Sequence, residues 1–284
     1  MRSIGFPPGS KFTGCLALLS TASKIDRVFS ILSECKPVIV AFSGGVDSTL
    51  VLKLAVERLG PSQVLAVTGI SPSIPKSEQE EARILAAQVG SPFHLLNTEE
   101  MQDENYLANT VNRCYFCKQE LFKKLNQLAE TKGYKTVLDG TNADDAGDWR
   151  PGMKAAQELS VRSPLLEAGL TKSEIRELSR NYNLPTWDKP AMPCLSSRIP
   201  HGEGITLERL DRVEKAERIL RNHGFSELRV RDHYPIARIE VPVNDLPRLI
   251  EEPLRSQIVQ EIKSIGYRFV SLELAGLKSG SLNP

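Results

Sequence analysis

The chain has 284 residues, enough for one large domain or for a medium-sized domain and a smaller one. Its 40% hydrophobic and 25% charged residues are ordinary for a globular protein, and its net charge of +1 argues against a general electrostatic attraction to nucleic acid or membranes. The 5 cysteines are an odd number in a chain too large to need disulfides, so we expect a cytoplasmic protein whose thiols act as ligands or reactive groups.

Residues 1–23 are predicted to form an N-terminal extension. Their apolar patch, Cys15–Leu19, is too short and too weakly basic for a secretory signal, although an organelle-targeting role stays open. No later run is long enough to span a bilayer, so no membrane association is expected.

Residues 24–186 alternate between strand-like and helix-like segments. Two capping boxes, Ser77-x-x-Glu80 and Thr171-x-x-Glu174, mark helix starts. Continuous apolar strands between helices predict an α/β domain with a parallel sheet covered on both faces. The expected strands are 38–42, 64–68, 93–96 and 136–139; the expected helices are 24–33, 48–58, 77–90, one after Cys117, and one from Thr171 that ends before Pro185.

The composition changes after this region. Residues 187–204 are rich in Pro, Ser and Gly and are predicted to form a structured linker loop that carries a cysteine. Residues 205–284 are predicted to form a smaller α+β domain. Its expected elements are a helix at 207–223, strands at 227–233 and 236–241, a helix at 255–265 and a strand at 267–272.

The most informative motif lies between the first strand and its helix, where the sequence reads Ser-Gly-Gly-Val-Asp-Ser. Gly44 and Gly45 allow a sharp turn that brings backbone N–H groups close to an anion, and the following helix points its positive end there. Ser43 and Ser48 can donate hydroxyl hydrogen bonds to phosphate oxygens, while Asp47 suits Mg²⁺. A simple glycine turn is the other interpretation.

No lysine follows the glycines, so the motif is not a Walker A loop, and it lacks the G-x-G-x-x-G spacing of a dinucleotide-binding fingerprint. It resembles the PP-loop of the adenine-nucleotide α-hydrolase superfamily. That resemblance implies a PP-loop ATP pyrophosphatase domain at 24–186, which cleaves ATP between its α and β phosphates and transfers AMP to an acceptor oxygen.

Three cysteines form a second candidate site. Cys114 and Cys117 make a C-x-x-C pair ahead of a predicted helix, and Cys194 lies in the linker. Zinc usually takes four ligands, for which His201 is the nearest fourth candidate. Three cysteines also suit a cubane iron–sulfur cluster with one iron free of protein ligands, and persulfide or redox chemistry is a further alternative.

Several separated segments narrow the resemblance. The segments 139–145 and 148–152 resemble the second nucleotide-proximal loop of one PP-loop branch, and 187–200 resembles its hallmark segment. The segments 229–231 and 237–240 resemble its C-terminal unit. Together they resemble the LarE-type pyridinium-biscarboxylate sulfur transferases, which help build the nickel-pincer nucleotide cofactor, over about Lys24 to Lys278.

The resemblance implies adenylation of a pyridinium carboxylate mononucleotide and sulfur insertion to give a thiocarboxylate. Some members sacrifice the sulfur of a single cysteine, whereas others use three cysteines around a [4Fe-4S] cluster. The three-cysteine pattern favours the cluster, held by Cys114, Cys117 and Cys194. The sulfur donor is unknown; we expect a homo-oligomer that binds no nucleic acid.

Further site residues follow from position and charge. Gly140 and Thr141 end a predicted strand and can border the nucleotide, while Lys118 and Arg150 can balance phosphate charge or be ordinary surface residues. Two linker residues, Ser197 and Arg198, can position the acceptor.

The predicted C-terminal domain adds residues for the substrate. Arg229 and Arg231 alternate along a strand and so share a face that suits the substrate phosphate, or a solvent-exposed face. Glu217 and Glu240 can bind a second metal or pair with these arginines.

Three other functions remain open. A tRNA thiolase of the same superfamily would use ATP and cysteines, but the near-neutral charge argues against it. A carboxylate-amidating ligase lacks its glutaminase signature here. A non-catalytic nucleotide-binding module would leave Asp47 and the cysteines without a role.

Overall fold

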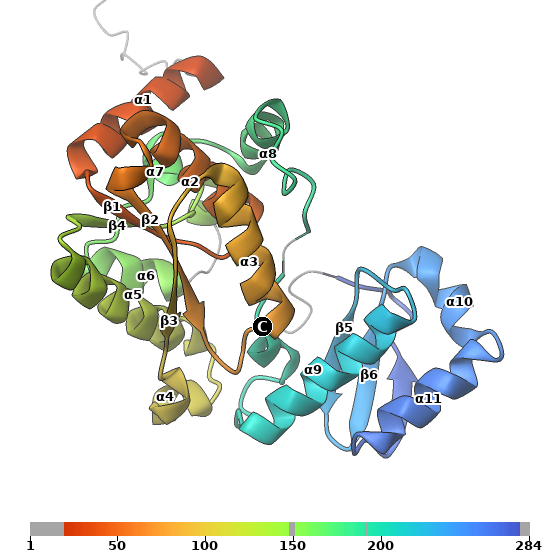
Figure 1. Ribbon diagram of the computed structural model, residues 1–284. Helices are drawn as coiled ribbons and strands as arrows, with labels where there is room; N and C mark the ends of the chain where they lie inside the picture. Colours follow the sequence, from red (N-terminus) through yellow and green to blue (C-terminus); the bar gives the residue numbers. More distant parts are fainter. Residues whose placement is uncertain (1–19, 148–150, 191, 279–284) are drawn as a thin grey trace, which may run out of the picture.

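A computed structural model describes residues 20–147, 151–190 and 192–278. The chain builds two groups of elements around two separate sheets, one with four strands and one with three. The first group (red to green in Figure 1) and the second (cyan to blue) lie next to each other. Within the described ranges, no helix combines the length and apolarity needed to cross a membrane.

The larger sheet is entirely parallel, as predicted. Its order is β3-β2-β1-β4, so the chain moves outward from β1 to β3 and then places β4 on the other side of β1. Loops that leave adjacent strands in opposite directions open a crevice at the carboxyl ends of the strands. The strands are β1 (Val38–Ala41), β2 (Val64–Ile70), β3 (Phe93–Asn97) and β4 (Thr136–Leu138).

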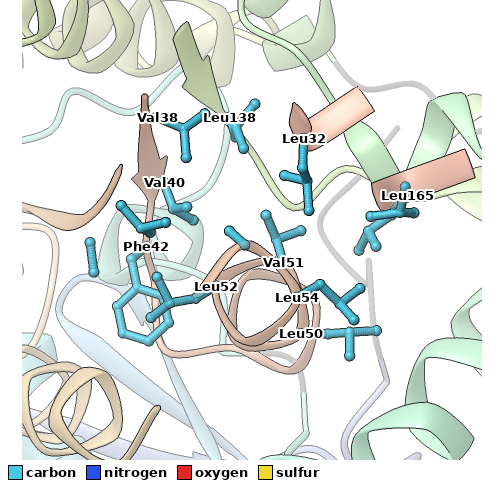
Figure 2. Packing of buried hydrophobic residues seen from close by; sticks show 14 of the residues in the cluster. Leu32, Val38, Val40, Phe42, Leu50, Val51, Leu52, Leu54, Leu138 and Leu165 are labelled. Carbon is cyan, nitrogen blue, oxygen red and sulfur yellow. The ribbon is translucent and has the colours of Figure 1, made fainter. Parts of the chain in front are cut away.

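Helices cover both faces of this sheet. On one face Leu50 and Leu54 pack with Val38 and Val40 in a cluster centred on α2 (Figure 2). Burying each such side chain contributes about 1.5–3 kcal/mol. Helices on this face are α1 (Thr21–Cys35), α2 (Val46–Leu59), α3 (Lys76–Val89), α7 (Pro164–Glu167) and α8 (Lys172–Asn181); α5 (Arg113–Lys132) and α6 (Pro151–Glu158) cover the opposite face, and α4 (Glu104–Leu107) precedes α5.

The second group has the predicted α+β composition. Its sheet has the order β5-β6-β7, with an antiparallel and a parallel pairing, and Val230, Ile239 and Ile258 belong to its own core. One short helix, α10, was not predicted. The elements are α9 (Leu207–Asn222), β5 (Arg229–His233), β6 (Ile236–Glu240), α10 (Leu246–Ile250), α11 (Leu254–Ser264) and β7 (Phe269–Leu272).

Helix starts are where the sequence-based predictions fail. The capping box predicted at Ser77 is wrong, because α3 begins at Lys76 after Pro75 and Ser77 therefore lies inside the helix. The capping box at Thr171 is confirmed. The C-x-x-C pair lies within the first turns of α5 rather than before a helix, since α5 begins at Arg113.

Candidate active site

The loop after β1 forms a cradle of backbone and hydroxyl groups. Gly44 adopts a left-handed conformation with φ of 69°, and Gly45 is the N-cap of α2 without any side-chain cap. The Oγ atoms of Ser43 and Ser48 are 3.1 Å apart, and the Gly45 N–H donates to Ser43 Oγ at 3.3 Å. Because α2 begins at Val46, two residues earlier than predicted, its positive end faces this cradle and favours an anion.

Asp47 lies in the first turn of α2 and faces the crevice beside β4. Lys172 Nζ is 2.5 Å from Asp47 Oδ2, and Asn142 donates to Oδ1 at 3.2 Å. Gly140 approaches so closely that a Cβ there would lie 2.9 Å from Ser48 N. The structure therefore brings the predicted Gly140 against the loop and adds Lys172 and Asn142, which the sequence analysis missed.

The other residues predicted to face ATP differ in their surroundings. Thr141 Oγ1 donates to Asp139 Oδ2 at 2.7 Å, so this hydroxyl stabilises the turn after β4. The Lys118 ammonium lies 5.3 Å from the centre of the Phe122 ring, and the residue is exposed. Arg150 lies outside the described residues.

The three predicted cysteines come from two segments that meet. Cys117 packs against an apolar cluster that contains Tyr106 and Leu195, and Leu195 directly follows Cys194. Burial raises the pKa of the Cys117 thiol, and the charges of Cys194 and Glu100 raise it further, so these groups lie within electrostatic range. In the part of the chain that the structure describes, no three His, Cys, Asp or Glu side chains are grouped closely enough to hold one metal ion.

The linker is held on the α/β domain at several points. Lys189 Nζ donates to the Gly44 carbonyl at 3.3 Å, which ties the linker to the phosphate loop. Further along, the Leu195 N–H donates to Ser73 O at 2.8 Å, and the hydroxyls of Tyr106 and Ser196 are 2.6 Å apart. The loops after β1 and β2 both lie at the carboxyl edge of the sheet, so the cysteines and the phosphate loop share that edge.

The linker also contacts the C-terminal sheet. Arg231 Nη1 donates to Ser197 O at 2.8 Å, and Ser197 Oγ accepts from Arg198 at 2.9 Å. Glu217 and Glu240 are engaged by arginines: Arg198 lies 2.7 Å from Glu217, and Arg231 lies 2.8 Å from Glu240. Both carboxylates are buried, so these pairs are part of the packed interior.

Arg229 differs from its neighbours on the same face. Its Nη1 donates to the Lys278 carbonyl at 3.1 Å, and among the described residues no carboxylate lies within ion-pair distance of it. Burial lowers the pKa of Arg229, and the nearby Arg231 and Arg198 lower it further. Arg229 is buried, at 8% exposed, beside two other arginines, and an excess of positive charge there favours binding of an anion.

Comparisons with known proteins cover the chain unevenly. The sequence profile of a family described as NAD synthase matches residues 26–129. An uncharacterized protein of Synechocystis sp. is 45% identical over 261 residues, which are 92% of this chain and 97% of that protein. The pyridinium-3,5-bisthiocarboxylic acid mononucleotide synthase of Lactiplantibacillus plantarum is 36% identical over 266 residues, 94% of this chain and 96% of that protein.

A more distant relative matches a smaller part of the chain. A tRNA-specific 2-thiouridylase of Carboxydothermus hydrogenoformans is 31% identical over 199 residues, but the match spans 55% of this chain and 53% of that protein. The two more similar relatives therefore match nearly the whole chain, whereas the thiouridylase matches about half of it.

Proposed function

This chain belongs to the family of the pyridinium-3,5-bisthiocarboxylic acid mononucleotide synthase, and we propose that it is an ATP-dependent sulfur transferase acting on a pyridinium-biscarboxylate mononucleotide. The observation that carries the proposal is the similarity over 94% of the chain, which includes both sheets and the linker between them. The product is a thiocarboxylate, as required for biosynthesis of the nickel-pincer nucleotide.

The first step is adenylation at the phosphate loop. A substrate carboxylate oxygen attacks the α-phosphorus of ATP, the bond from that phosphorus to the bridging oxygen breaks, and pyrophosphate leaves. We assign Ser43, Gly44, Gly45 and Ser48 to the pyrophosphate, with Gly140 and Thr141 bordering the nucleotide. The loop is suited to this role because the positive end of α2 has no side-chain cap and the hydroxyls of Ser43 and Ser48 lie together beside it.

Charged residues around the loop complete this step. Asp47 would hold Mg²⁺, which would neutralise phosphate charge; an oxygen donor whose present partner is a lysine ammonium fits such an ion. Lys172, Lys118 and Arg150 are proposed to face the negatively charged phosphates. The Lys172–Asp47 pair is partly exposed, so arriving ligands can replace it.

The second step is attack of sulfur on the acyl carbon, which displaces AMP. We propose that Cys114, Cys117 and Cys194 hold a [4Fe-4S] cluster, which would supply sulfur at an iron free of protein ligands. A mononuclear zinc site draws its ligands to about 2.3 Å from one ion. Cys117 and the turn that bears Cys194 meet at one apolar cluster, so the two segments can supply the three thiolates of a cubane cluster.

The substrate phosphate is assigned to the face of β5. Arg229 is the main candidate because it has no carboxylate partner in the described part of the chain, while Arg231, Arg198 and Ser197 support it through the linker. Glu217 and Glu240 are proposed as partners of these arginines, rather than as ligands of a second metal.

One reconstitution tests the function. Purified protein, kept anaerobic, is incubated with ATP, Mg²⁺, sulfide and the mononucleotide, and the products are measured as pyrophosphate and by mass spectrometry of the nucleotide. We expect pyrophosphate together with a nucleotide in which oxygen is replaced by sulfur. Pyrophosphate release that depends on tRNA, with an unchanged mononucleotide, would support the thiolase alternative instead.

A further inference from the structure

Arg113 is a buried cation whose partners are all neutral. It is the first residue of α5 and only 6% exposed. Nη1 donates to Asn109 Oδ1 at 2.6 Å and to Ser196 O at 2.9 Å, while Nη2 lies 4.0 Å from Cys114 Sγ. Over the described ranges, no Asp or Glu lies within ion-pair distance of this guanidinium. Burying an unpaired charge is unfavourable, so this position suits an anion that joins it.

The helix start adds positive potential at the same point. The first turn of α5 contains no acidic residue, and its N-cap Asn112 makes no side-chain cap. The N–H groups of Arg113 and Tyr115 donate to Thr110 O and Asn112 O, and the dipole of this 20-residue helix favours a nearby anion. The acidic neighbour of Cys117 is the buried Glu100, which accepts a hydrogen bond from Ser71 and does not pair with Arg113.

The guanidinium also connects the two cysteine segments. Through Ser196 O it contacts the turn that carries Cys194, and its Nη2 lies near the Sγ of Cys114, the first cysteine of the C-x-x-C pair. The hydroxyls of Tyr106 and Ser196 fix that turn independently, so the guanidinium has a defined position between the segments.

We propose that Arg113 is the counter-ion of the sulfur centre, a positioning residue that holds anionic sulfur, such as hydrosulfide, between Cys114 and the turn bearing Cys194. The proposal rests on the sulfur-transfer function above. It explains why a cation is buried at this helix start without a carboxylate: the negative charge arrives with the sulfur.

The test uses two alkylating reagents on metal-free protein. Iodoacetate is an anion and iodoacetamide is neutral, and both react with the same thiolate, so the ratio of their rates at Cys114 reports local potential rather than thiolate fraction. Cys114 is exposed and therefore accessible. We expect the ratio of the iodoacetate rate to the iodoacetamide rate to be higher at Cys114 of the parent protein than in N-acetylcysteine amide. In Arg113→Gln this ratio should fall about fivefold, because a nearby positive charge has been removed.

Arg113→Lys separates the effect of charge from that of hydrogen bonding, because lysine keeps the positive charge but lacks the planar set of N–H donors of a guanidinium. We expect its ratio to stay within about twofold of the parent. Arg83→Gln, on the exposed surface of α3, is the control and should leave the ratio unchanged. An unchanged ratio in Arg113→Gln, or an equal fall in both Arg113 variants, would overturn the proposal.

Folding and function are checked separately. ATP binding measured by calorimetry reports whether each variant is folded. If Arg113→Gln does not fold, Arg113→Lys becomes the test: a rate ratio at its Cys114 equal to that of N-acetylcysteine amide would refute the proposal. The assay uses neither nucleotide nor substrate. A parent protein that forms no thiocarboxylate would therefore contradict the proposed function while the ratio still tested Arg113.

Discussion

The phosphate loop and an arginine–glutamate layer beside the C-terminal sheet, made of the buried pairs Arg198–Glu217 and Arg231–Glu240, both pair charges but in opposite settings. At the loop, the Lys172 and Asp47 side chains are 37% and 23% exposed. In the layer, Arg198 and Glu217 are 3% and 0% exposed. Partly exposed pairs contribute little to stability and exchange partners easily, whereas removing one member of a buried pair leaves a costly charge. The loop is therefore suited to ligand exchange, and the layer to holding the linker in place.

This contrast also separates the arginines on the C-terminal face. Arg231 and Arg198 are committed to buried carboxylates and to the linker, so their main role is architectural. Arg229, without a carboxylate partner in the described chain, is the arginine that we propose for the substrate phosphate. The predictions below test that division, beginning with the largest expected effect.

Removing the buried carboxylate should give the largest loss of stability. Glu217→Ala leaves Arg198 buried without its anion, and the Val230 N–H loses an acceptor. We expect the free energy of unfolding to fall by about 3–5 kcal/mol in urea denaturation. Glu57→Ala, which breaks an exposed pair with Lys53, is the control and should cost less than about 1 kcal/mol. Similar losses in both variants would remove the distinction between the two settings.

The loop variant should lose activity instead of stability. Asp47→Ala should slow pyrophosphate release by about 10²–10³-fold, because positioned charge supplies about 3 kcal/mol or more of barrier lowering. Its unfolding free energy should change by less than about 1 kcal/mol, since the Lys172 pair is partly exposed. Release of ADP, or release of pyrophosphate at the parent rate, would show that the loop is misassigned.

Arg229→Ala tests the assignment of Arg229 to the phosphate of the mononucleotide. Loss of one charge-assisted hydrogen bond, worth about 1.5 kcal/mol or more, should raise the apparent KM for the mononucleotide by at least about tenfold and leave that for ATP unchanged. Arg238→Ala is a matched control on the neighbouring strand, because Arg238 is paired with Glu240 and Glu273. Equal effects on the two substrates would place Arg229 outside the substrate site.

The smallest effect concerns the support of α8, which carries Lys172. Burial acts to raise the pKa of Glu174, but hydrogen bonds from Lys24 and Thr171 lower it to about 2. The folded pKa is thus below the unfolded value, so the stabilisation is present above about pH 4.3 and is lost as the pH falls toward 2. Glu174→Gln should remove about 1 kcal/mol of this pH dependence in denaturation between about pH 5 and pH 3. The control variant Glu57→Gln should keep the pH dependence of the parent protein.

The same contrast explains what the sequence could predict. The phosphate loop was predictable because its groups lie within six consecutive residues, Ser43–Ser48, and Gly140 because parallel strand ends share an edge. Lys172 was not, since it meets Asp47 across 125 residues without any spacing signal. The choice between metal binding and ion pairing for Glu217 and Glu240 also required knowledge of burial.

The sequence-based prediction of a helix start failed where two N-terminal signals lie close together. Ser77 had the pattern of an N-cap, but Pro75 stands two residues earlier and α3 begins directly after it. The parallel sheet and the α+β order of the second group were predictable because their apolar patterns are long. Arg113 stood beside the predicted cysteines, and only its burial without a carboxylate distinguished it.

The claim that three cysteines act as one sulfur centre, distinct from the phosphate loop, is tested most directly by single Ser variants at Cys114, Cys117 and Cys194. Under anaerobic conditions, sulfur transfer is measured by mass spectrometry of the nucleotide, adenylation by pyrophosphate release, and the cluster by absorption near ~400 nm. We predict that each variant loses thiocarboxylate formation and the absorption while still releasing pyrophosphate, and that Cys35→Ser keeps all three. Dependence on Cys194 alone, with its conversion to dehydroalanine by loss of H₂S, would contradict this account and identify a protein that sacrifices one cysteine per turnover.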